Sequence, residues 1–313
     1  MKRVLITGGA GFIGSNLARH LLEVYAEKNK DIQVTVFDSL TYAGSLKNLN
    51  FHDPTKSCIF VKADVRDLDQ VKRYVSESDE VFHLAAESHV DRSIVNPNLF
   101  VETNVIGTAN LLLAATEFKV RMVLVSTDEV YGSILRGSAD ENAALNPSSP
   151  YSASKASADL LALSFHKTYG TNVVITRCAN NFGLNQFPEK LIPLAIRNVS
   201  MGLPIPVYGN GQNVREWIHV KDHCSGLLLV MEKGKSGEIY NFGSGNELRN
   251  IDLIDAILKY MGKGNEYIQF VDDRLGHDHR YSLNSSKVKS ILNWTPNLRL
   301  EDCLEELIRA YSA

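Results

Sequence analysis

Eight residues near the amino terminus, TGGAGFIG at positions 7 to 14, indicate the architecture of this protein. A β-branched apolar run at positions 4 to 7 leads into them, and an amphipathic pattern at positions 16 to 27 follows. Within the stretch, Gly8 permits a tight turn, Gly11 lets a phosphate approach the backbone, and Gly14 lets helix and strand pack closely. Strand, glycine turn and helix together predict a dinucleotide site, with the pyrophosphate at the positive end of the helix.

Short apolar runs alternate with helical patterns along the rest of the first half. We expect strands at residues 33–37, 58–62, 80–83, 122–126 and 172–176, and long helices at 98–118 and 150–169. Strands separated by helices indicate an α/β fold, a Rossmann-type doubly wound parallel sheet that binds ligands at its carboxyl edge. Prolines and glycines change the rhythm after residue 177 and predict a smaller C-terminal α/β substrate-binding domain. We expect residues 1–177 in the cofactor domain, with 217–240 returning to it, and residues 178–216 and 241–313 in the second domain.

The composition argues against several classes of function. The formal net charge of −3 provides no basic field for nucleic acid. We see no stretch that approaches the roughly 18 apolar residues of a membrane span. The four cysteines, Cys58, Cys178, Cys224 and Cys303, lack the spacing of a metal site or a disulfide framework. We therefore expect a cytoplasmic protein with no metal and with neither nucleic acid nor membrane as a partner.

Asp38 ends the second expected strand, where its carboxylate can accept hydrogen bonds from both hydroxyls of an adenosine ribose. A 2′-phosphate would meet like charge there, so the position favours NAD over NADP. The alternative is an aspartate that caps a helix. Asp64 and Val65 follow the third strand and are expected to bracket the adenine, although Asp64 could instead cap the next helix.

Tyr151 and Lys155 lie four residues apart on an expected helix and so share one face. An ammonium beside a phenol favours the phenolate, which predicts a lowered pKa for Tyr151 and a role as a base. The lysine can also hold the nicotinamide ribose. The predicted cofactor site therefore comprises Gly8, Gly11, Phe12, Ile13, Gly14, Asp38, Asp64, Val65, Tyr151 and Lys155.

Three polar residues, Thr127, Asp128 and Glu129, follow the expected strand at 122–126. Thr127 can hydrogen-bond the substrate hydroxyl that is oxidised. Two adjacent carboxyl groups suit removal of a proton from carbon and donation of a proton to a leaving hydroxyl, because their surroundings can separate their pKa values. The alternative is a solvated acidic turn.

These residues occur in motifs that resemble the extended short-chain dehydrogenase/reductase family and, within it, the dTDP-glucose 4,6-dehydratases. The resemblance covers essentially the whole chain. Its motifs are TGGAGFIGSN, DSLTYAG, HLAAESHVDRSI, ETNVIGT, STDEVYG, YSASKASAD, TRCANNFG, QFPEKLIPL, YGNGQNVREW and DRLGHDHRY.

The resemblance implies an NAD-dependent lyase that converts dTDP-glucose into dTDP-4-keto-6-deoxyglucose. Oxidation at C4, with Tyr151 as base, precedes loss of water across C5 and C6 and return of the hydride to C6. In this scheme Glu129 removes the C5 proton, Asp128 protonates the leaving hydroxyl and Thr127 orients the 4-keto oxygen. The second domain is then the nucleotide-sugar-binding one, with substrate contacts from Ser88, Asn180, Lys190, Arg215, Asn250, Arg274 and His277.

The resemblance also implies a homodimer in which the helices at 98–118 and 151–169 pack against their copies, through leucines at positions 111, 112, 160, 161 and 163. The alternative is that these leucines face only the sheet of their own chain. Three other functions stay open: the same reaction on UDP-glucose, a nucleotide-sugar 4-epimerase, which would not need Asp128 and Glu129, and a non-catalytic NAD-binding regulator.

Overall fold

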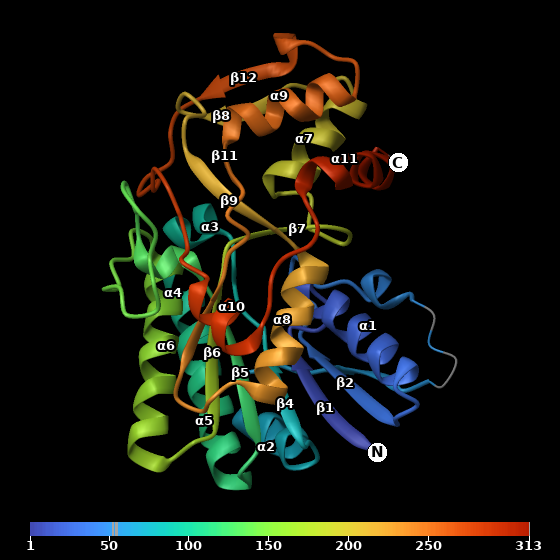
Figure 1. Ribbon diagram of the computed structural model, residues 1–313, viewed down its shortest axis with the longest axis vertical. Helices are drawn as coiled ribbons and strands as arrows, with labels where there is room; N and C mark the ends of the chain where they lie inside the picture. Colours follow the sequence, from blue (N-terminus) through green and yellow to red (C-terminus); the bar gives the residue numbers. More distant parts are fainter. Residues whose placement is uncertain (52, 54–55, 313) are drawn as a thin grey trace.

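A seven-stranded parallel sheet forms the centre of the larger part of the molecule (Figure 1). The computed structural model describes residues 1–51, 53 and 56–312. The strand order is β10-β6-β5-β4-β1-β2-β3. Strands β2 and β3 lie on one side of β1 and the later strands lie on its other side, which confirms the expected doubly wound sheet. The strands are β1 (Lys2–Thr7), β2 (Ile32–Asp38), β3 (Cys58–Lys62), β4 (Glu80–His83), β5 (Arg121–Thr127), β6 (Val173–Cys178) and β10 (Ile239–Phe242).

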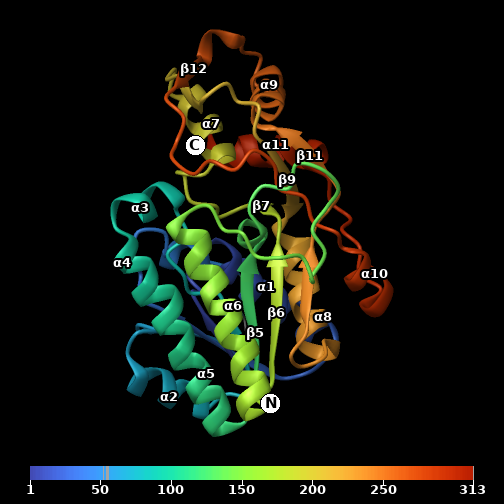
Figure 2. The same ribbon diagram turned by 90° about the vertical axis from the view of Figure 1, so that its left-hand side faces the viewer.

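Helices cover both faces of this sheet because successive strand residues point to opposite sides. Val4 and Ile6 belong to one buried cluster and Leu5 to the other. On the first face lie α1 (Phe12–Glu27) and α8 (Val220–Lys233), and on the second lie α2 (Leu68–Ser76), α5 (Gly107–Phe118) and α6 (Pro150–Tyr169) (Figures 1 and 2). The short elements η1 (Leu46–Leu49), α3 (Val90–Val95) and η3 (Asp128–Tyr131) follow β2, β4 and β5.

The expected helix at 98–118 is one continuous run composed of α4 (Pro97–Phe100), the π-helical segment η2 (Val101–Ile106) and α5. By length and composition alone it could cross a membrane, since it has 22 residues and a mean hydropathy of 1.3 in its most apolar window. The sequence expectation of no such stretch is therefore wrong. Half of that window is buried inside the protein, and Leu111, Ala114 and Ala115 belong to the core beneath the sheet. Core helices of globular proteins meet the same criterion.

A smaller unit stands over the carboxyl edge of the large sheet (Figure 1). It contains a three-stranded sheet, β11-β9-β7, and a two-stranded sheet, β12-β8. Its strands are β7 (Asn180–Phe182), β8 (Ile205–Tyr208), β9 (Val214–His219), β11 (Glu247–Arg249) and β12 (Ile268–Val271). Its helices, α7 (Leu191–Ser200), α9 (Asn250–Tyr260), η4 (Asn265–Tyr267) and α11 (Leu300–Tyr311), surround a core that includes Ile196, Ile254 and Leu304.

The chain passes between the two units several times. After β9 it returns to the larger unit, where α8 contacts α1 and β10 forms the edge of the sheet. The short helix α10 (Ser286–Leu292) also lies on the larger unit, and Trp294 packs edge-on against Phe242 with ring centres 4.8 Å apart. Residues 286–294 thus lie on the larger unit, although the division from sequence groups them with the smaller one.

Candidate active site

A large cavity opens at the carboxyl edge of the sheet, beside the point where the strand order reverses, and both units line it. Most of the side chains predicted from the sequence meet there. Its lining includes Gly8, Gly11, Phe12, Ile13, Gly14, Asp38, Asp64, Val65, Ser88, Thr127, Asp128, Glu129, Tyr151, Lys155, Asn180 and Lys190. Parallel strands bring their carboxyl ends to the same edge, so residues distant in sequence become neighbours.

The glycine turn has the geometry of a phosphate-binding loop. Gly8 has φ +68°, and a Cβ there would lie 2.7 Å from the backbone of Ala85. A Cβ on Gly14 would lie 2.3 Å from the carbonyl oxygen of Gly8, whereas the nearest atom to one on Gly11 is 3.2 Å away. Gly11 is the N-cap of α1, and no side chain caps this helix end. The first N–H groups of α1 therefore face the cavity with the positive end of the helix dipole.

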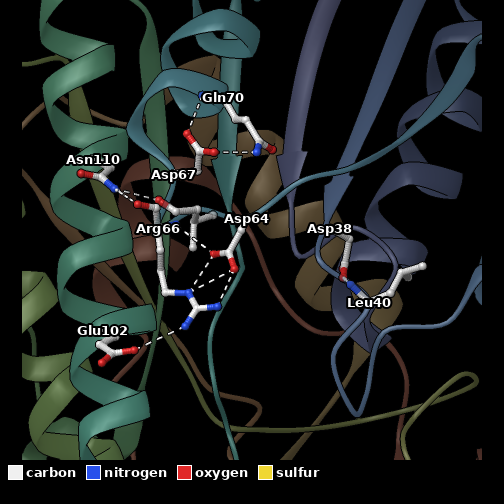
Figure 3. A network of polar contacts seen from close by, with 9 residues as sticks. Asp38, Leu40, Asp64, Arg66, Asp67, Gln70, Glu102 and Asn110 are labelled. Atoms are coloured by element: carbon white, nitrogen blue, oxygen red, sulfur yellow. Dashed lines mark hydrogen bonds and ion pairs between the residues drawn. The ribbon is translucent and has the colours of Figure 1, made fainter.

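Two aspartates line the cavity, Asp38 at the end of β2 and Asp64 just after β3. Figure 3 shows both side chains with polar contacts. Asp38 accepts hydrogen bonds from the backbone N–H groups of Ala10 at 3.0 Å and Leu40 at 2.8 Å, and burial raises its pKa. Asp64 binds the guanidinium of Arg66, whose hydrogen bonds lower the pKa of Asp64. Neither aspartate caps a helix, because Ser45 caps η1 after Asp38 and Asp67 caps α2 after Asp64. A carboxylate at the end of β2, beside open helix N–H groups, fits NAD.

Tyr151 and Lys155 face the cavity from the first turns of α6, where Ser149 caps the helix in a capping box with Ser152. The structure contradicts the expected effect of Lys155 on Tyr151. Lys155 donates from Nζ to the carbonyl oxygen of Val125 at 2.8 Å, while burial and the charge of Glu129 raise the pKa of Tyr151 well above its ordinary value. A hydrogen bond with Thr127 opposes that rise.

Thr127 ends β5, and the 3₁₀ turn η3 then carries the adjacent carboxyl groups. The Thr127 hydroxyl donates to Asp128 Oδ1 at 3.2 Å and accepts from the backbone N–H of Glu129 at 3.3 Å. Asp128 is buried, so the alternative of a solvated acidic turn is excluded.

Asp128 and Glu129 differ in the balance of charges that act on them, although the charge of Arg215 acts to lower the pKa of both. Burial, Glu129 and Glu216 raise the pKa of Asp128 well above its ordinary value. Burial also raises the pKa of Glu129, but the charges of Arg274, Lys190 and Arg215 oppose that rise. Anionic neighbours therefore add to the effect of burial at Asp128, whereas cationic neighbours oppose it at Glu129, a difference that can separate an acid from a base.

Three predicted substrate residues, Ser88, Asn180 and Lys190, line the cavity between the two units. Lys190 precedes α7 and donates from Nζ to the carbonyl oxygen of Ser88 at 3.1 Å. Burial lowers the pKa of Lys190, while Glu189 and Glu129 oppose that change. This contact joins the smaller unit to the loop after β4.

The other four predicted substrate residues, Arg215, Asn250, Arg274 and His277, belong to the smaller unit and are not among the residues that line the cavity. Arg215 is 5% exposed, and its guanidinium donates to the carbonyl oxygens of Val214 and Asp278 at 2.8 and 2.9 Å. It is therefore not a solvated surface cation. The guanidinium nitrogen Nε of Arg274 and Oδ1 of Asn250 are buried without a hydrogen-bond partner.

His277 contacts Asp273, with 2.6 Å between Nδ1 and Oδ1, and its ring lies edge-on to Tyr208 at 6.1 Å. Burial and the charge of Arg274 lower its pKa.

Sequence reasoning missed several residues of the cavity wall, chiefly Tyr42, Arg66, Glu87, Phe187 and Glu189. Tyr42 contacts the Ser88 hydroxyl at 3.3 Å and lies edge-on to Phe187. Buried carboxylate oxygens of Glu87 and Glu189 have no hydrogen-bond partner. Four of the five lie within motifs that carry the resemblance, and that was the only signal, because none has a spacing typical of a site.

Comparison with known proteins agrees with this geometry. The model of the family described as GDP-mannose 4,6 dehydratase matches residues 5–307. A dTDP-glucose 4,6-dehydratase from Streptomyces niveus is 47% identical over 310 residues, which are 99% of this chain and 92% of the relative. The crystal structure of DesIV, a dTDP-glucose 4,6-dehydratase from Streptomyces venezuelae with NAD and dTDP bound, superimposes with a TM-score of 0.96 at 48% identity, covering 99% of this chain and 96% of the other.

Epimerases share the fold at lower identity. A UDP-glucose 4-epimerase from Thermotoga maritima has a TM-score of 0.89 at 28% identity, covering 99% of this chain and 98% of that one. The fold alone therefore does not separate dehydration from epimerisation, and the residues of the cavity must do so.

Proposed function

The chain belongs to the GDP-mannose 4,6 dehydratase family, and from this premise we propose that it converts dTDP-glucose into dTDP-4-keto-6-deoxyglucose and water. The observation that carries the proposal is the adjacent pair Asp128 and Glu129 in the cavity that also contains Tyr151 and Lys155. An oxidoreductase or a 4-epimerase needs only the tyrosine, the lysine and a hydrogen-bonding hydroxyl. Two further carboxyl groups with divergent surroundings suit the loss of water.

The first step is oxidation at C4 of the glucose ring. Tyr151 takes the proton of the 4-hydroxyl, and Thr127 hydrogen-bonds the oxygen as it becomes a ketone. Lys155 and Asp38 hold the nicotinamide ribose and the adenosine ribose, respectively, while the N–H groups of α1 receive the pyrophosphate. When bound, NAD accepts the hydride of C4 and later returns it to C6, so the cofactor is regenerated in each turnover.

The second step is the loss of water across C5 and C6. The new ketone at C4 makes the C5 proton acidic, and Glu129 removes it. Asp128 gives its proton to the C6 hydroxyl, which leaves as water and creates a double bond between C5 and C6. A proton at C5 and the returning hydride at C6 complete the 6-deoxy sugar. The charges that face each carboxyl group support this division of roles.

We assign the nucleotide diphosphate to the smaller unit. Arg215 and Arg274 have planar guanidinium groups that suit bidentate contacts with phosphate oxygens. Asn180, Lys190, Asn250 and His277 complete the proposed set, with Ser88 facing the sugar. The charges of both arginines act on Glu129, which supports a position close to the reacting sugar.

A panel of dTDP-, UDP-, CDP- and GDP-glucose tests the function. Incubation with dTDP-glucose should give a product lighter by one water, because a 4-keto-6-deoxy sugar forms. Clean conversion to dTDP-galactose would indicate a 4-epimerase instead. NAD binding without turnover of any nucleotide sugar would indicate a regulator. Faster turnover of UDP-glucose than of dTDP-glucose would show that the site prefers uracil to thymine.

We propose that two copies of the chain pair through the outer faces of the α4–η2–α5 run and α6. Exposed apolar side chains there support this, namely Val101, Ile106, Leu113 and Leu160. Leu111 and Leu112 are fully buried in their own chain and cannot contribute. Sedimentation velocity tests the pairing: Leu160→Glu should shift a dimer towards monomer, whereas a monomeric wild-type protein would refute it.

We also propose the cytoplasm as the compartment. All four cysteines are free thiols, which supports a reducing environment. Fractionation of cells that produce the protein tests this, and recovery with the membrane pellet after a high-salt wash would contradict it.

A further inference from the structure

Arg177, in the motif TRCANNFG, is one of the largest side chains that the protein buries, at 2% exposed. It lies near the carboxyl end of β6. Its Nε donates to Asp159 Oδ2 at 2.8 Å, and its Nη1 donates to the hydroxyl of Tyr131 at 2.8 Å. The guanidinium carbon also lies 4.7 Å from the centre of the Tyr131 ring. One buried guanidinium therefore holds a side chain of α6 and a side chain of η3.

These two partners belong to the elements that carry the proposed chemistry. Asp159 lies one helical turn after Lys155 on α6, the helix that begins with Tyr151 in its first turn. Tyr131 ends η3, whose first residues are Asp128 and Glu129. Neither Asp159, Arg177 nor Tyr131 lines the cavity. Any influence of this network on the reaction therefore acts through the residues of α6 and η3.

The network is buried and specific. The Tyr131 hydroxyl donates to Asn241 Oδ1 at 2.9 Å, and Asn241 Nδ2 donates to the carbonyl oxygen of Ala139 at 3.0 Å. Asp159 and Asn241 are both fully buried. A buried ion pair costs desolvation and is often no more stabilising than apolar side chains of the same volume. Stability alone is thus a weak reason for this arrangement, whereas positioning of η3 relative to α6 needs directional bonds.

We propose that Arg177 is a positioning residue that sets the carboxyl pair of η3 relative to the tyrosine and lysine of α6. Its hydrogen bond to Tyr131 positions η3 for the elimination step, and its ion pair with Asp159 positions α6 for the oxidation step. The inference rests on the proposed function, because it assigns separate steps of that reaction to the two elements. It requires that loss of the Tyr131 contact and loss of the Asp159 contact slow different steps of the reaction.

Tyr131→Phe keeps the ring over which the guanidinium lies but removes both hydrogen bonds of the hydroxyl. In a single turnover with dTDP-glucose, NADH absorbance should rise at the wild-type rate and then decay about tenfold more slowly or worse, because η3 is displaced. Arg177→Lys should behave similarly, since an ammonium beside Asp159 cannot also reach Tyr131 as the planar fork does.

Asp159→Asn should instead slow the first phase, the formation of NADH. NADH should appear about tenfold more slowly, without later accumulation, because the turn of α6 that carries Lys155 is no longer held. The same variant should bind NAD several-fold more weakly in a fluorescence titration of the apoprotein, while Tyr131→Phe binds it normally. Asp159 also raises the pKa of Lys155 against the effect of burial, so its loss should move the alkaline limit of NADH formation to lower pH.

Two matched controls separate positioning from loss of stability. Tyr240→Phe removes a buried hydroxyl that accepts from the backbone N–H of Lys235, and Asp222→Asn alters a buried carboxylate that accepts from Asn297 and Leu298. Both should lower the melting temperature without changing either NADH phase or NAD affinity.

The inference would be overturned if Tyr131→Phe and Asp159→Asn slowed both phases equally, or if they behaved like the controls. A wild-type protein that makes no 4-keto product would refute the proposed function instead. In that case the NAD titration alone would test the inference, and unchanged NAD affinity in Asp159→Asn would reject the positioning role of Asp159.

Discussion

Asp128 and Glu129 are neighbours in the chain, yet the charge of Glu216 adds to the rise in the pKa of Asp128 on burial, while the charges of Arg274 and Lys190 oppose that rise at Glu129. This relationship distinguishes two carboxyl groups that the sequence alone presents as equivalent. It supports the proposed roles of Asp128 as proton donor and Glu129 as proton acceptor, and each role has measurable consequences.

Glu129→Gln should slow product formation by about 10²- to 10⁴-fold, because no carboxylate removes the C5 proton. NAD should remain bound, and NADH should accumulate when dTDP-glucose is added. Stopped-flow absorbance and product analysis measure the two effects together. A variant with wild-type turnover would remove Glu129 from the proposed chemistry.

The same variant should change the pH dependence of the first step. The charge of Glu129 raises the pKa of Tyr151, and NADH formation requires a deprotonated Tyr151. Removal of that charge lowers the pKa of Tyr151, so the rise of the NADH burst rate with pH should shift to lower pH. An unchanged or alkaline-shifted profile would show that the two side chains do not interact.

Arg274→Gln should shift the acid limb of dehydration to higher pH. Arg274 is the largest of the cationic influences that oppose the raised pKa of Glu129, so its loss lets that pKa rise further. Glu129 is then protonated, and inactive as a base, over a wider range of acidic pH. The profile of kcat against pH measures this, and Arg274→Lys should restore much of it. A change in KM alone would mean that Arg274 contacts only the nucleotide.

Asp38→Asn should weaken NAD binding by about 10- to 100-fold, because a charge-assisted hydrogen bond contributes about 1.5–3 kcal/mol. Discrimination against NADP should shrink, since the like charge that repels a 2′-phosphate is gone. Titration of the apoprotein with both cofactors measures the ratio, and Asp64→Asn, which neutralises the other aspartate of this part of the cavity, is the matched comparison. Unchanged rejection of NADP would assign that selectivity elsewhere.

Strong periodic patterns allowed the larger sheet to be predicted closely. The strands at 58–62 and 80–83 have the expected bounds, and β1, β2 and β5 extend beyond theirs by one or two residues. Strand β6 begins one residue later and ends two residues later than expected. The cavity lining followed from topology, because parallel strands deliver Asp38, Asp64 and Thr127 to one edge. The seven-residue helix α10 is too short to have a clear period, so its return to the larger sheet was not foreseen.

Side-chain orientation was harder to predict than position. Tyr151 and Lys155 share a face of α6 as expected, but the Lys155 ammonium donates its hydrogen bond to the carbonyl oxygen of Val125 on β5. Burial is the largest influence on the pKa of Tyr151 and raises it. Arg66 was missed because its pairing with Asp64 depends on the turn before α2. The sequence contains no pattern that specifies such contacts between separate elements.

Transfer of the C4 hydrogen tests the central claim most directly. The protein is incubated with dTDP-glucose carrying deuterium at C4, and the position of the label in the product is read by NMR. We predict that the label moves to C6 of a product that has lost one water. Label retained at C4 of a hexose that keeps its C6 hydroxyl would contradict the account.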